Sequence, residues 1–290
     1  MRDYVIVTDS SCDLPAKLVE ELELQVVPLA FTLGETTYRN YPDNREMEPE
    51  AFYARLAAGE MATTTAVNVG QAMDILEPIL QGGKDVLVLG FSSGLSATFH
   101  SFQMAAAELA DRYRQRRAYA VDTLCASLGQ GMLVAQAARL RQQGMDMDQV
   151  RSWVLDNRLH QCHWFTVNDL NFLKRGGRVS AATALVGTML QIKPVMHMDD
   201  AGHLINMAKA RGRKASLLEL VDKVRELGTQ PDQQTMYVSH SACLEDAQFV
   251  ADEVKRRYGV KEVVINSIGP VIGAHTGPGC VALFFTGSKR

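Results

Sequence analysis

The chain lacks the features that mark several large classes of protein. It contains no uncharged apolar stretch long enough to cross a bilayer, and its first residues lack the long apolar region of a signal peptide. Its five cysteines are scattered, odd in number and without a Cys-x-x-Cys pair, so we expect no disulfide framework. These absences predict a soluble protein of the cytoplasm.

The sequence also has little that nucleic acids, nucleotides or metal ions would need. Its net charge is −3 and its isoelectric point is near 6.2, which argues against nucleic acid as the main partner. It has no Gly-x-x-x-x-Gly-Lys-Ser/Thr loop and no Gly-x-Gly-x-x-Gly after a strand. His160, Cys162 and His163 match no zinc pattern, and we expect two exposed histidines beside a buried cysteine there. No cofactor is expected.

What the chain does have is a hydroxyl-rich loop between a strand-like run and an amphipathic helix, within residues 86–101. The hydroxyls belong to Ser92, Ser93, Ser96 and Thr98. Free backbone N–H groups and the helix dipole favour an anion at such a loop. The loop contains no Lys or Arg, which suits a small, singly charged anion better than a triphosphate. The alternative is that each hydroxyl only caps its own helix.

The first half alternates strand-like and helix-like segments, which predicts an α/β fold with a doubly wound, mostly parallel sheet. Apolar runs at 4–8, 86–91 and 118–121 are strands, and each leads into a polar loop. We expect extended segments at 25–32 and 36–38. Helices are expected at 15–22, with Asp13 as the N-cap, at 49–58 and at 70–80. Loops that follow parallel strands emerge at one edge of the sheet, so the polar loops should meet there.

The second half mixes parallel and antiparallel signals. Residues 192–198 and 203–209 read as two strands joined by a turn at 199–202. Helical patterns at 168–173, 215–227 and 244–258 alternate with apolar runs at 164–167, 235–239, 262–267 and 280–286. With 290 residues, 47% of them hydrophobic, the chain can bury two cores. We predict an N-terminal domain over 1–157 that carries the hydroxyl-rich loops and a C-terminal α/β domain over 158–290 with a mixed sheet.

Further polar residues are candidates for the site. Thr63, Thr64 and Thr65 precede the helix at 70–80, and Asp9 and Asp122 occupy matching positions after their strands. We expect the two aspartates to orient loops rather than act as acid and base. His275 lies in a run rich in Gly and Pro at 268–279, which predicts a loop. Two basic clusters, at 174–178 and 209–214, contain glycines and are also expected in loops, either as anion sites or as solvated surface.

Six segments of the chain, in order and spanning its whole length, resemble the DegV family. They are Val-Thr-Asp-Ser-Ser-Cys-Asp-Leu-Pro at 7–15, Ser-Ser-Gly-Leu-Ser-Ala-Thr-Phe at 92–99, Val-Asp-Thr-Leu-Cys-Ala-Ser-Leu-Gly-Gln-Gly at 121–131, Leu-Lys-Arg-Gly-Gly-Arg-Val-Ser at 173–180, Ile-Lys-Pro-Val at 192–195 and Ile-Gly-Pro-Val-Ile-Gly-Ala-His-Thr-Gly-Pro-Gly at 268–279. The resemblance implies a two-domain α/β protein that binds one long-chain fatty acid. In this family hydroxyls at the domain interface hold the carboxylate, and the second domain buries the tail.

The resemblance also assigns residues. Ser92 and Ser93 would hold the carboxylate with Thr64 or Thr65, and His275 would complete the network. The basic residues would flank the mouth or face a partner: Arg211 near the ligand, and Lys174, Arg175 and Arg178 toward the partner. The expected tail-lining residues are Leu185, Val186, Met189, Leu190, Ile192, Val195 and Met196. The chain departs from the family pattern within 64–68 and within 96–99. The first departure leaves the contacting threonine open.

Family members serve as the lipid-carrying subunit of a bacterial fatty acid kinase. By resemblance, this chain has no catalytic residues of its own and presents the carboxylate to a separate ATP-binding protein, which forms the acyl phosphate. Transient contact with a membrane, to exchange lipid, is a further expectation. Two alternatives stay open. One is an enzyme that hydrolyses an acyl phosphate or ester, with Ser93 as nucleophile and His275 as base. The other is a binding module for another small carboxylate.

Overall fold

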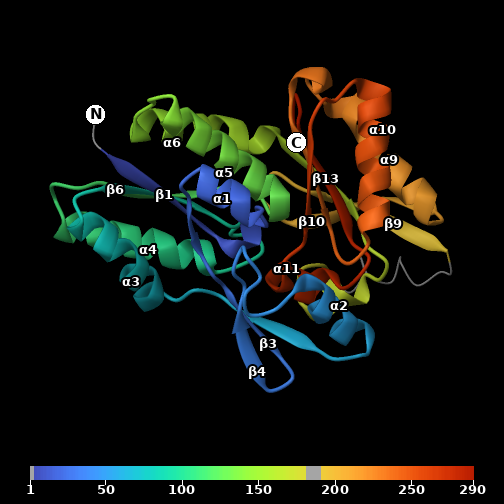
Figure 1. Ribbon diagram of the computed structural model, residues 1–290, viewed down its shortest axis with the longest axis horizontal. Helices are drawn as coiled ribbons and strands as arrows, with labels where there is room; N and C mark the ends of the chain where they lie inside the picture. Colours follow the sequence, from blue (N-terminus) through green and yellow to red (C-terminus); the bar gives the residue numbers. More distant parts are fainter. Residues whose placement is uncertain (1–2, 181–190) are drawn as a thin grey trace.

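The computed structural model describes residues 3–180 and 191–290, which form two larger sheets and one small sheet, with helices packed around the larger sheets (Figure 1). The N-terminal sheet is parallel throughout, in the order β2-β1-β6-β7. Its strands are β1 (Tyr4–Asp9), β2 (Gln25–Val27), β6 (Asp85–Gly90) and β7 (Ala118–Asp122). Every residue of β6 is buried, as expected for a central strand with helices on both faces.

Helices cover both faces of this sheet. In Figure 1, α5 and α6 lie on one side and α3 and α4 on the other. The helices of this part are α1 (Ala16–Glu21), α2 (Pro49–Ala57), α3 (Val69–Gln81), α4 (Thr98–Arg112), α5 (Ser127–Gln142) and α6 (Met147–Asn157), with a short 3-10 helix η1 (Ser10–Cys12) after β1. The alternation along β1 explains the layering, since Ile6 faces the α5 side and Val7 faces the side of α3 and α4.

A small antiparallel sheet, in the order β4-β3-β5, projects from this domain. Its strands are β3 (Ala30–Leu33), β4 (Thr36–Arg39) and β5 (Ala62–Thr65). Thr64 pairs with Phe31 in the β3–β5 register, so the threonine run that we expected in a loop is a strand. Alternation along β5 leaves Thr64 half-buried and its neighbours Thr63 and Thr65 exposed.

The C-terminal sheet is mixed, in the order β10-β9-β8-β13-β11-β12, with only the β11–β12 pair parallel. Its strands are β8 (Gln161–Thr166), β9 (Ile192–Met198), β10 (Leu204–Arg211), β11 (Met236–His240), β12 (Val263–Ser267) and β13 (Val281–Thr286). The helices are α7 (Asn171–Arg175), α9 (Arg213–Leu227), α10 (Leu244–Tyr258) and α11 (Pro270–Thr276), with 3-10 turns η2 (Arg158–His160) and η3 (Pro231–Gln233).

The structure confirms the fold class and the hairpin at 192–211 but corrects several local predictions. The segment at 268–279 carries a short helix, α11, because Pro270 occupies its first turn and Gly277 ends it with φ +66°. Asp13 does not cap α1. Its carboxylate instead accepts hydrogen bonds from Ser127 and from the backbone N–H of Gly269. The basic clusters lie mostly on α7, β10 and α9, not in loops.

The two sheets meet through α5. Its first turns contact β8, β11 and β13, and one apolar cluster runs from β1 through α5 into the C-terminal sheet. Gly129 permits this approach, because a Cβ there would lie 2.2 Å from Nε2 of His163 and 2.7 Å from Cδ1 of Phe284. His163 is therefore buried at the domain junction, not exposed as we had expected, and its Nε2 accepts a hydrogen bond from the N–H of Ala126.

Candidate functional site

A cavity of about 300 Å³ lies between the N-terminal loops, α11 and the C-terminal sheet. Residues of β5, the β6–α4 loop and α5 line it on one side, and residues of β8, β9, β10, α11 and β13 on the other. Its lining residues are Leu29, Thr64, Thr65, Ala66, Phe91, Leu95, Ser96, Ala97, Ala126, Ser127, His163, Phe165, Leu173, Arg178, Met198, Leu204, Ile268, Val271, Ile272, His275, Thr276, Cys280, Ala282 and Phe284. The loops that follow the parallel strands thus reach a binding cavity, as the fold rule for such sheets predicts.

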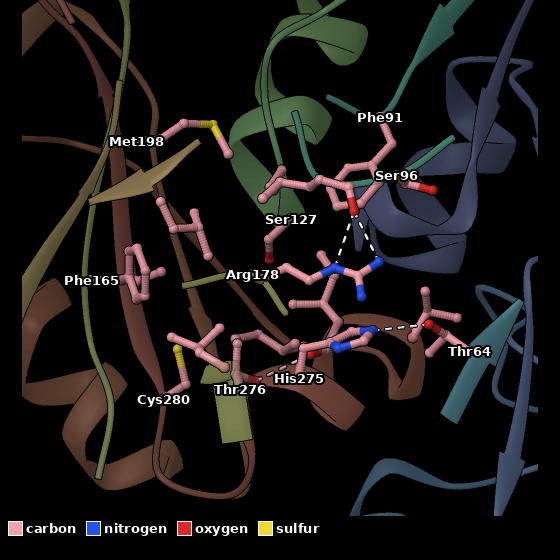
Figure 2. Close-up of a pocket in the computed structure, with 18 of the residues that line it drawn as sticks. Thr64, Phe91, Ser96, Ser127, Phe165, Arg178, Met198, His275, Thr276 and Cys280 are labelled. Carbon is pink, nitrogen blue, oxygen red and sulfur yellow. Dashed lines mark hydrogen bonds between the residues drawn. The ribbon is translucent and has the colours of Figure 1, made fainter. Parts of the chain in front are cut away.

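Several of the polar residues that line this cavity lie together on one side of it. Figure 2 shows Thr64, Ser96, Arg178 and His275 on one side and Phe165, Met198 and Cys280 on the opposite side. The apolar end also includes Ala282 and Phe284, which are buried in the C-terminal sheet. A cavity with a small polar end and a long apolar wall fits an elongated molecule with one polar head.

His275 is joined to Thr64 across the domain junction. Its Nε2 lies 2.9 Å from Oγ1 of Thr64, while its Nδ1 is buried without a hydrogen-bond partner in the described part of the chain. Gly176 packs against this Nδ1, since a Cβ at that position would lie 2.1 Å from it. Burial, and then the positive charge of Arg178, lower the pKa of His275 to about 4. The imidazole is therefore neutral at pH 7 and acts as a hydrogen-bonding group.

Arg178 supplies the positive charge that the hydroxyl-rich loop lacks. Its Nε and Nη2 donate to the carbonyl oxygen of Leu95 at 3.1 and 2.9 Å, and its Nη1 donates to the carbonyl of Gly176. The guanidinium is half-buried, and burial lowers its pKa from the ordinary value. It makes no ion pair with a carboxylate among residues 3–180 and 191–290, so a positive charge faces the cavity without a counter-charge of its own. Sequence reasoning had placed Arg178 on the partner-facing surface.

The hydroxyl-rich loop is held by its own hydrogen bonds. Oγ of Ser96 donates to Oγ1 of Thr98 at 3.0 Å, and Oγ1 of Thr98 accepts from the N–H of Val67 at 3.3 Å. Ser96 lines the cavity, whereas Thr98 is buried beneath it. Asp9 and Asp122 orient the loop from below: Asp9 accepts from the N–H of Phe91, and Asp122 from that of Ser93. Their expected role as loop-orienting residues is confirmed by these contacts.

Ser92 and Ser93 lie beside the cavity but do not line it. Ser92 is fully buried, and its hydroxyl donates to the carbonyl oxygen of Gly202 at 2.9 Å, in the turn between β9 and β10. In this structure its proton therefore joins the hydroxyl-rich loop to the turn between β9 and β10, and the role of Ser92 in holding a ligand stays a prediction. The hydroxyl of half-buried Ser93 has no hydrogen-bond partner in the described part of the chain.

The remaining predicted site residues fall into three groups. Thr64, Thr65 and His275 line the cavity together. Arg211 is exposed on β10, and Lys174 and Arg175 are exposed on α7, and all three are absent from the lining. Among the expected tail-lining residues, the four at 185–190 lie outside the described residues, while Ile192, Val195 and Met196 are on β9 and do not line the cavity. The apolar wall comes instead from β8, β13 and Met198, residues that only the sheet topology could bring together.

The geometry does not support the hydrolase alternative. Residues 90–94 fit the Gly-x-Ser-x-Gly pattern of a nucleophile elbow, but Ser92 at its centre is buried and bonded to Gly202. No hydrogen bond joins Ser93 to His275 among the described residues, and no carboxylate orients Nδ1 of that histidine. Within the part of the chain that the structure describes, Ser93 and His275 thus do not form a nucleophile paired with an oriented base. Nor do three or more His, Cys, Asp or Glu side chains converge as a metal site within the described ranges.

Comparison with known proteins identifies the family. The model of an uncharacterised protein family, DegV, matches residues 3–287. The chain belongs to the DegV family. A DegV domain-containing protein of Clostridium perfringens, CPE0026, is 41% identical over 290 residues, covering 100% of this chain and 99% of the relative. A second relative, YteA of Lactococcus lactis, is 31% identical and covers 99% of this chain.

Solved structures of DegV proteins share the whole fold. A DegV family protein from Thermus thermophilus, described by its fatty acid binding, superposes with a TM-score of 0.87 at 31% identity and covers 99% of this chain and 100% of its own. DegV of Bacillus subtilis, described as a fatty-acid-binding protein, has a TM-score of 0.85 at 27% identity, with 99% and 100% coverage. Within the described residues, no helix is long and apolar enough to span a bilayer.

Proposed function

We propose that this DegV protein is a fatty-acid carrier that holds one long-chain fatty acid in the cavity between its domains. The carboxylate lies at the polar end, against Arg178, Ser96 and the hydroxyls of Thr64 and Thr65, and the tail lies along the apolar wall. The observation that carries the proposal is the cavity itself, in which Thr64, Ser96, Arg178 and His275 lie on one side and mostly apolar side chains line the opposite side. The fatty-acid-binding relatives support it.

The Thr64–His275 pair sets the direction of the hydrogen bonds in the proposed head-group site. Neutral His275 and Thr64 are within hydrogen-bond distance. In this proposal the imidazole carries its proton on Nε2 and donates to Oγ1 of Thr64, so that the threonine proton is donated to the carboxylate. Arg178 adds charge-assisted hydrogen bonds, which are about twice as strong as neutral ones. One guanidinium and two or three hydroxyls can satisfy a single carboxylate at a half-buried site.

The apolar wall supplies the affinity. Burial of a methylene is worth about 0.8 kcal/mol, so a chain of about 14 methylenes contributes about 11 kcal/mol before association costs of about 4–15 kcal/mol. A fatty acid of about six carbons would gain about 3 kcal/mol from the same wall and would bind weakly. The dependence of affinity on the length of the acyl chain therefore distinguishes a fatty-acid carrier from a binding module for short carboxylates.

In the same proposal the protein presents its carboxylate to a separate ATP-binding kinase, as the family resemblance implies. Residues 3–180 and 191–290 place no oriented base or nucleophile near the proposed head group, so in this proposal the phosphorylating groups come from another protein. Exposed Lys174 and Arg175, next to the polar end on α7, are the surface we assign to that partner.

The proposal is tested by titrating delipidated protein with palmitic acid and with hexanoic acid while intrinsic fluorescence or heat is recorded. We expect one palmitate per chain and binding of hexanoate weaker by at least two orders of magnitude. Equal affinity for the two acids would support the module for short carboxylates instead. Hydrolysis of added acyl phosphate by the protein alone would support the alternative that the protein is a hydrolase.

A further inference from the structure

A second crevice lies at the far edge of the C-terminal sheet, at the carboxyl ends of the parallel strands β11 and β12 and the start of α10. It measures about 470 Å³ and shares no lining residue with the cavity between the domains. Parallel strands in α/β folds place ligands at this edge. Its lining includes one residue of α2, Glu50, so three separate parts of the chain converge there.

His240 is the buried polar group that faces this crevice. Its side chain is 7% exposed, and its Nδ1 accepts a hydrogen bond from the N–H of Cys243 at 3.4 Å. Burial lowers the pKa of His240, although the carboxylate of Glu50 opposes this effect. A neutral imidazole whose Nδ1 accepts carries its proton on Nε2. That donor has no partner in the described part of the chain, and His240 lines the crevice.

The crevice lining also includes Glu50, a hydrogen-bond acceptor with a negative charge. Glu50 is exposed in the first turn of α2, where the helix dipole stabilises its carboxylate, and it makes no ion pair or hydrogen bond with a described residue. It lies near His240 without bonding to it. Glu245, in the first turn of α10 and outside the lining, adds negative charge nearby. An anion is therefore disfavoured here, in contrast to the cavity between the domains.

Apolar side chains also line this crevice. Leu244 is 57% exposed at the start of α10 and lines the crevice together with Ala242 and Ile265. The aliphatic stem of a ligand could lie on these side chains. Its cationic group would then pair with Glu50, and a hydrogen-bond acceptor at its other end would accept from Nε2–H of His240. Ser267 also lines the crevice, and its hydroxyl is a further hydrogen-bonding group.

We propose that this crevice is a second binding site, for a small organic molecule that carries an ammonium group at one end of a short aliphatic stem and a hydrogen-bond acceptor, such as a hydroxyl, at the other. The ammonium pairs with Glu50, the acceptor receives the proton of His240 Nε2, and the stem covers Leu244. The site does not depend on the proposed fatty-acid function, because none of its residues reaches that cavity.

The test is an NMR titration of the full-length protein, in which the imidazole Cε1–H signal of His240 is followed. The signal is assigned by its loss in His240→Gln. Three probes of equal length differ only at one end: aminobutanol, butanediol and hydroxybutyrate, each with its two polar groups at opposite ends. We expect aminobutanol to shift the signal with at least about tenfold higher affinity than butanediol, and hydroxybutyrate to leave it unmoved.

Two variants that each remove one carboxylate show whether the preference for aminobutanol comes from contact with Glu50 in the crevice or only from the negative charge around it. Glu50→Gln should abolish the preference for aminobutanol, whereas Glu245→Gln removes the same charge from outside the lining and should change the affinity less than about threefold. Equal shifts with aminobutanol and butanediol, no shift with any probe, or a preference that survives Glu50→Gln would each overturn the proposal.

Discussion

Replacing Arg178 by Gln should weaken the binding of a fatty acid without weakening the binding of the corresponding fatty alcohol. Arg178 is the cation that lines the polar end of the cavity, and its own hydrogen bonds go to the carbonyls of Leu95 and Gly176. Its charge therefore remains available to a carboxylate. A hydrogen bond to a charged group contributes about 1.5–3 kcal/mol, so the dissociation constant for palmitate should rise about 10- to 150-fold.

The alcohol separates the loss of charge from damage to the site. Hexadecanol offers the same tail without a carboxylate, so Arg178→Gln should change its affinity less than about threefold. Arg178→Lys keeps the positive charge but loses the two-pronged contact with Leu95, and should give an intermediate effect. Affinities are measured by displacement of a fluorescent fatty acid from delipidated protein.

Arg175→Gln is the matched control. Arg175 lies three residues earlier, is exposed on α7 and stacks on Phe172, so its substitution removes the same charge without touching the cavity. Its effect on palmitate binding should stay below about threefold. If Arg175→Gln weakens binding as much as Arg178→Gln does, or if Arg178→Gln weakens hexadecanol and palmitate equally, the reasoning about the head-group site is wrong.

Three further predictions concern Thr64, Asp13 and Gly129. Thr64→Val removes the hydroxyl that meets His275 and should weaken palmitate binding by about 0.5–1.5 kcal/mol, measured by the same displacement assay. Burial raises the pKa of Asp13 to about 7, so between about pH 4 and pH 7 the folded state holds a proton that the unfolded state has released. The contribution of Asp13 to stability should therefore fall as pH rises from about 4 to about 7. Asp13→Asn should remove this pH dependence from the free energy of unfolding measured in urea. Gly129→Ala should lower the free energy of unfolding by about 1–3 kcal/mol or more, because its Cβ would overlap His163.

Matched substitutions and opposing outcomes accompany these predictions. Thr63→Val removes an exposed hydroxyl outside the cavity and should leave palmitate binding unchanged. Gly70→Ala, whose Cβ would lie 3.4 Å from Oδ1 of Asn68, should change stability by less than about 1 kcal/mol. Three results would contradict the contacts on which these predictions rest. Thr63→Val would weaken palmitate binding as much as Thr64→Val, the pH dependence of stability would persist in Asp13→Asn, or Gly129→Ala would be as stable as Gly70→Ala.

Sequence patterns predicted the parallel sheet and the hairpin because their signals are local. The apolar run of β6 and the turn before β10 each lie within one short segment, so period and turn chemistry suffice. The threonine run was harder. Thr64 becomes a strand residue only because β5 pairs with β3, about thirty residues earlier in the chain, and polar composition had favoured a loop.

The candidate site shows the same division. Thr64, Thr65 and His275 were predicted from motifs and do meet in one cavity. The hydrogen bond from Ser92 to the carbonyl oxygen of Gly202 could not be predicted from sequence, because the position of Gly202 depends on how the two sheets dock. The family resemblance assigned Arg178 to the partner-facing surface, and the structure also places it in the cavity lining, where Gly176 of the same segment packs against His275. Long-range packing decides both placements.

The most direct test of the account is denaturing extraction of the purified protein, followed by mass spectrometry of the released small molecules. The account predicts one long-chain fatty acid per chain, lost or strongly reduced in Arg178→Gln and retained in Arg175→Gln. Protein that releases no fatty acid, and takes up none when palmitate is added, would contradict the claim that the cavity between the domains is a fatty-acid site.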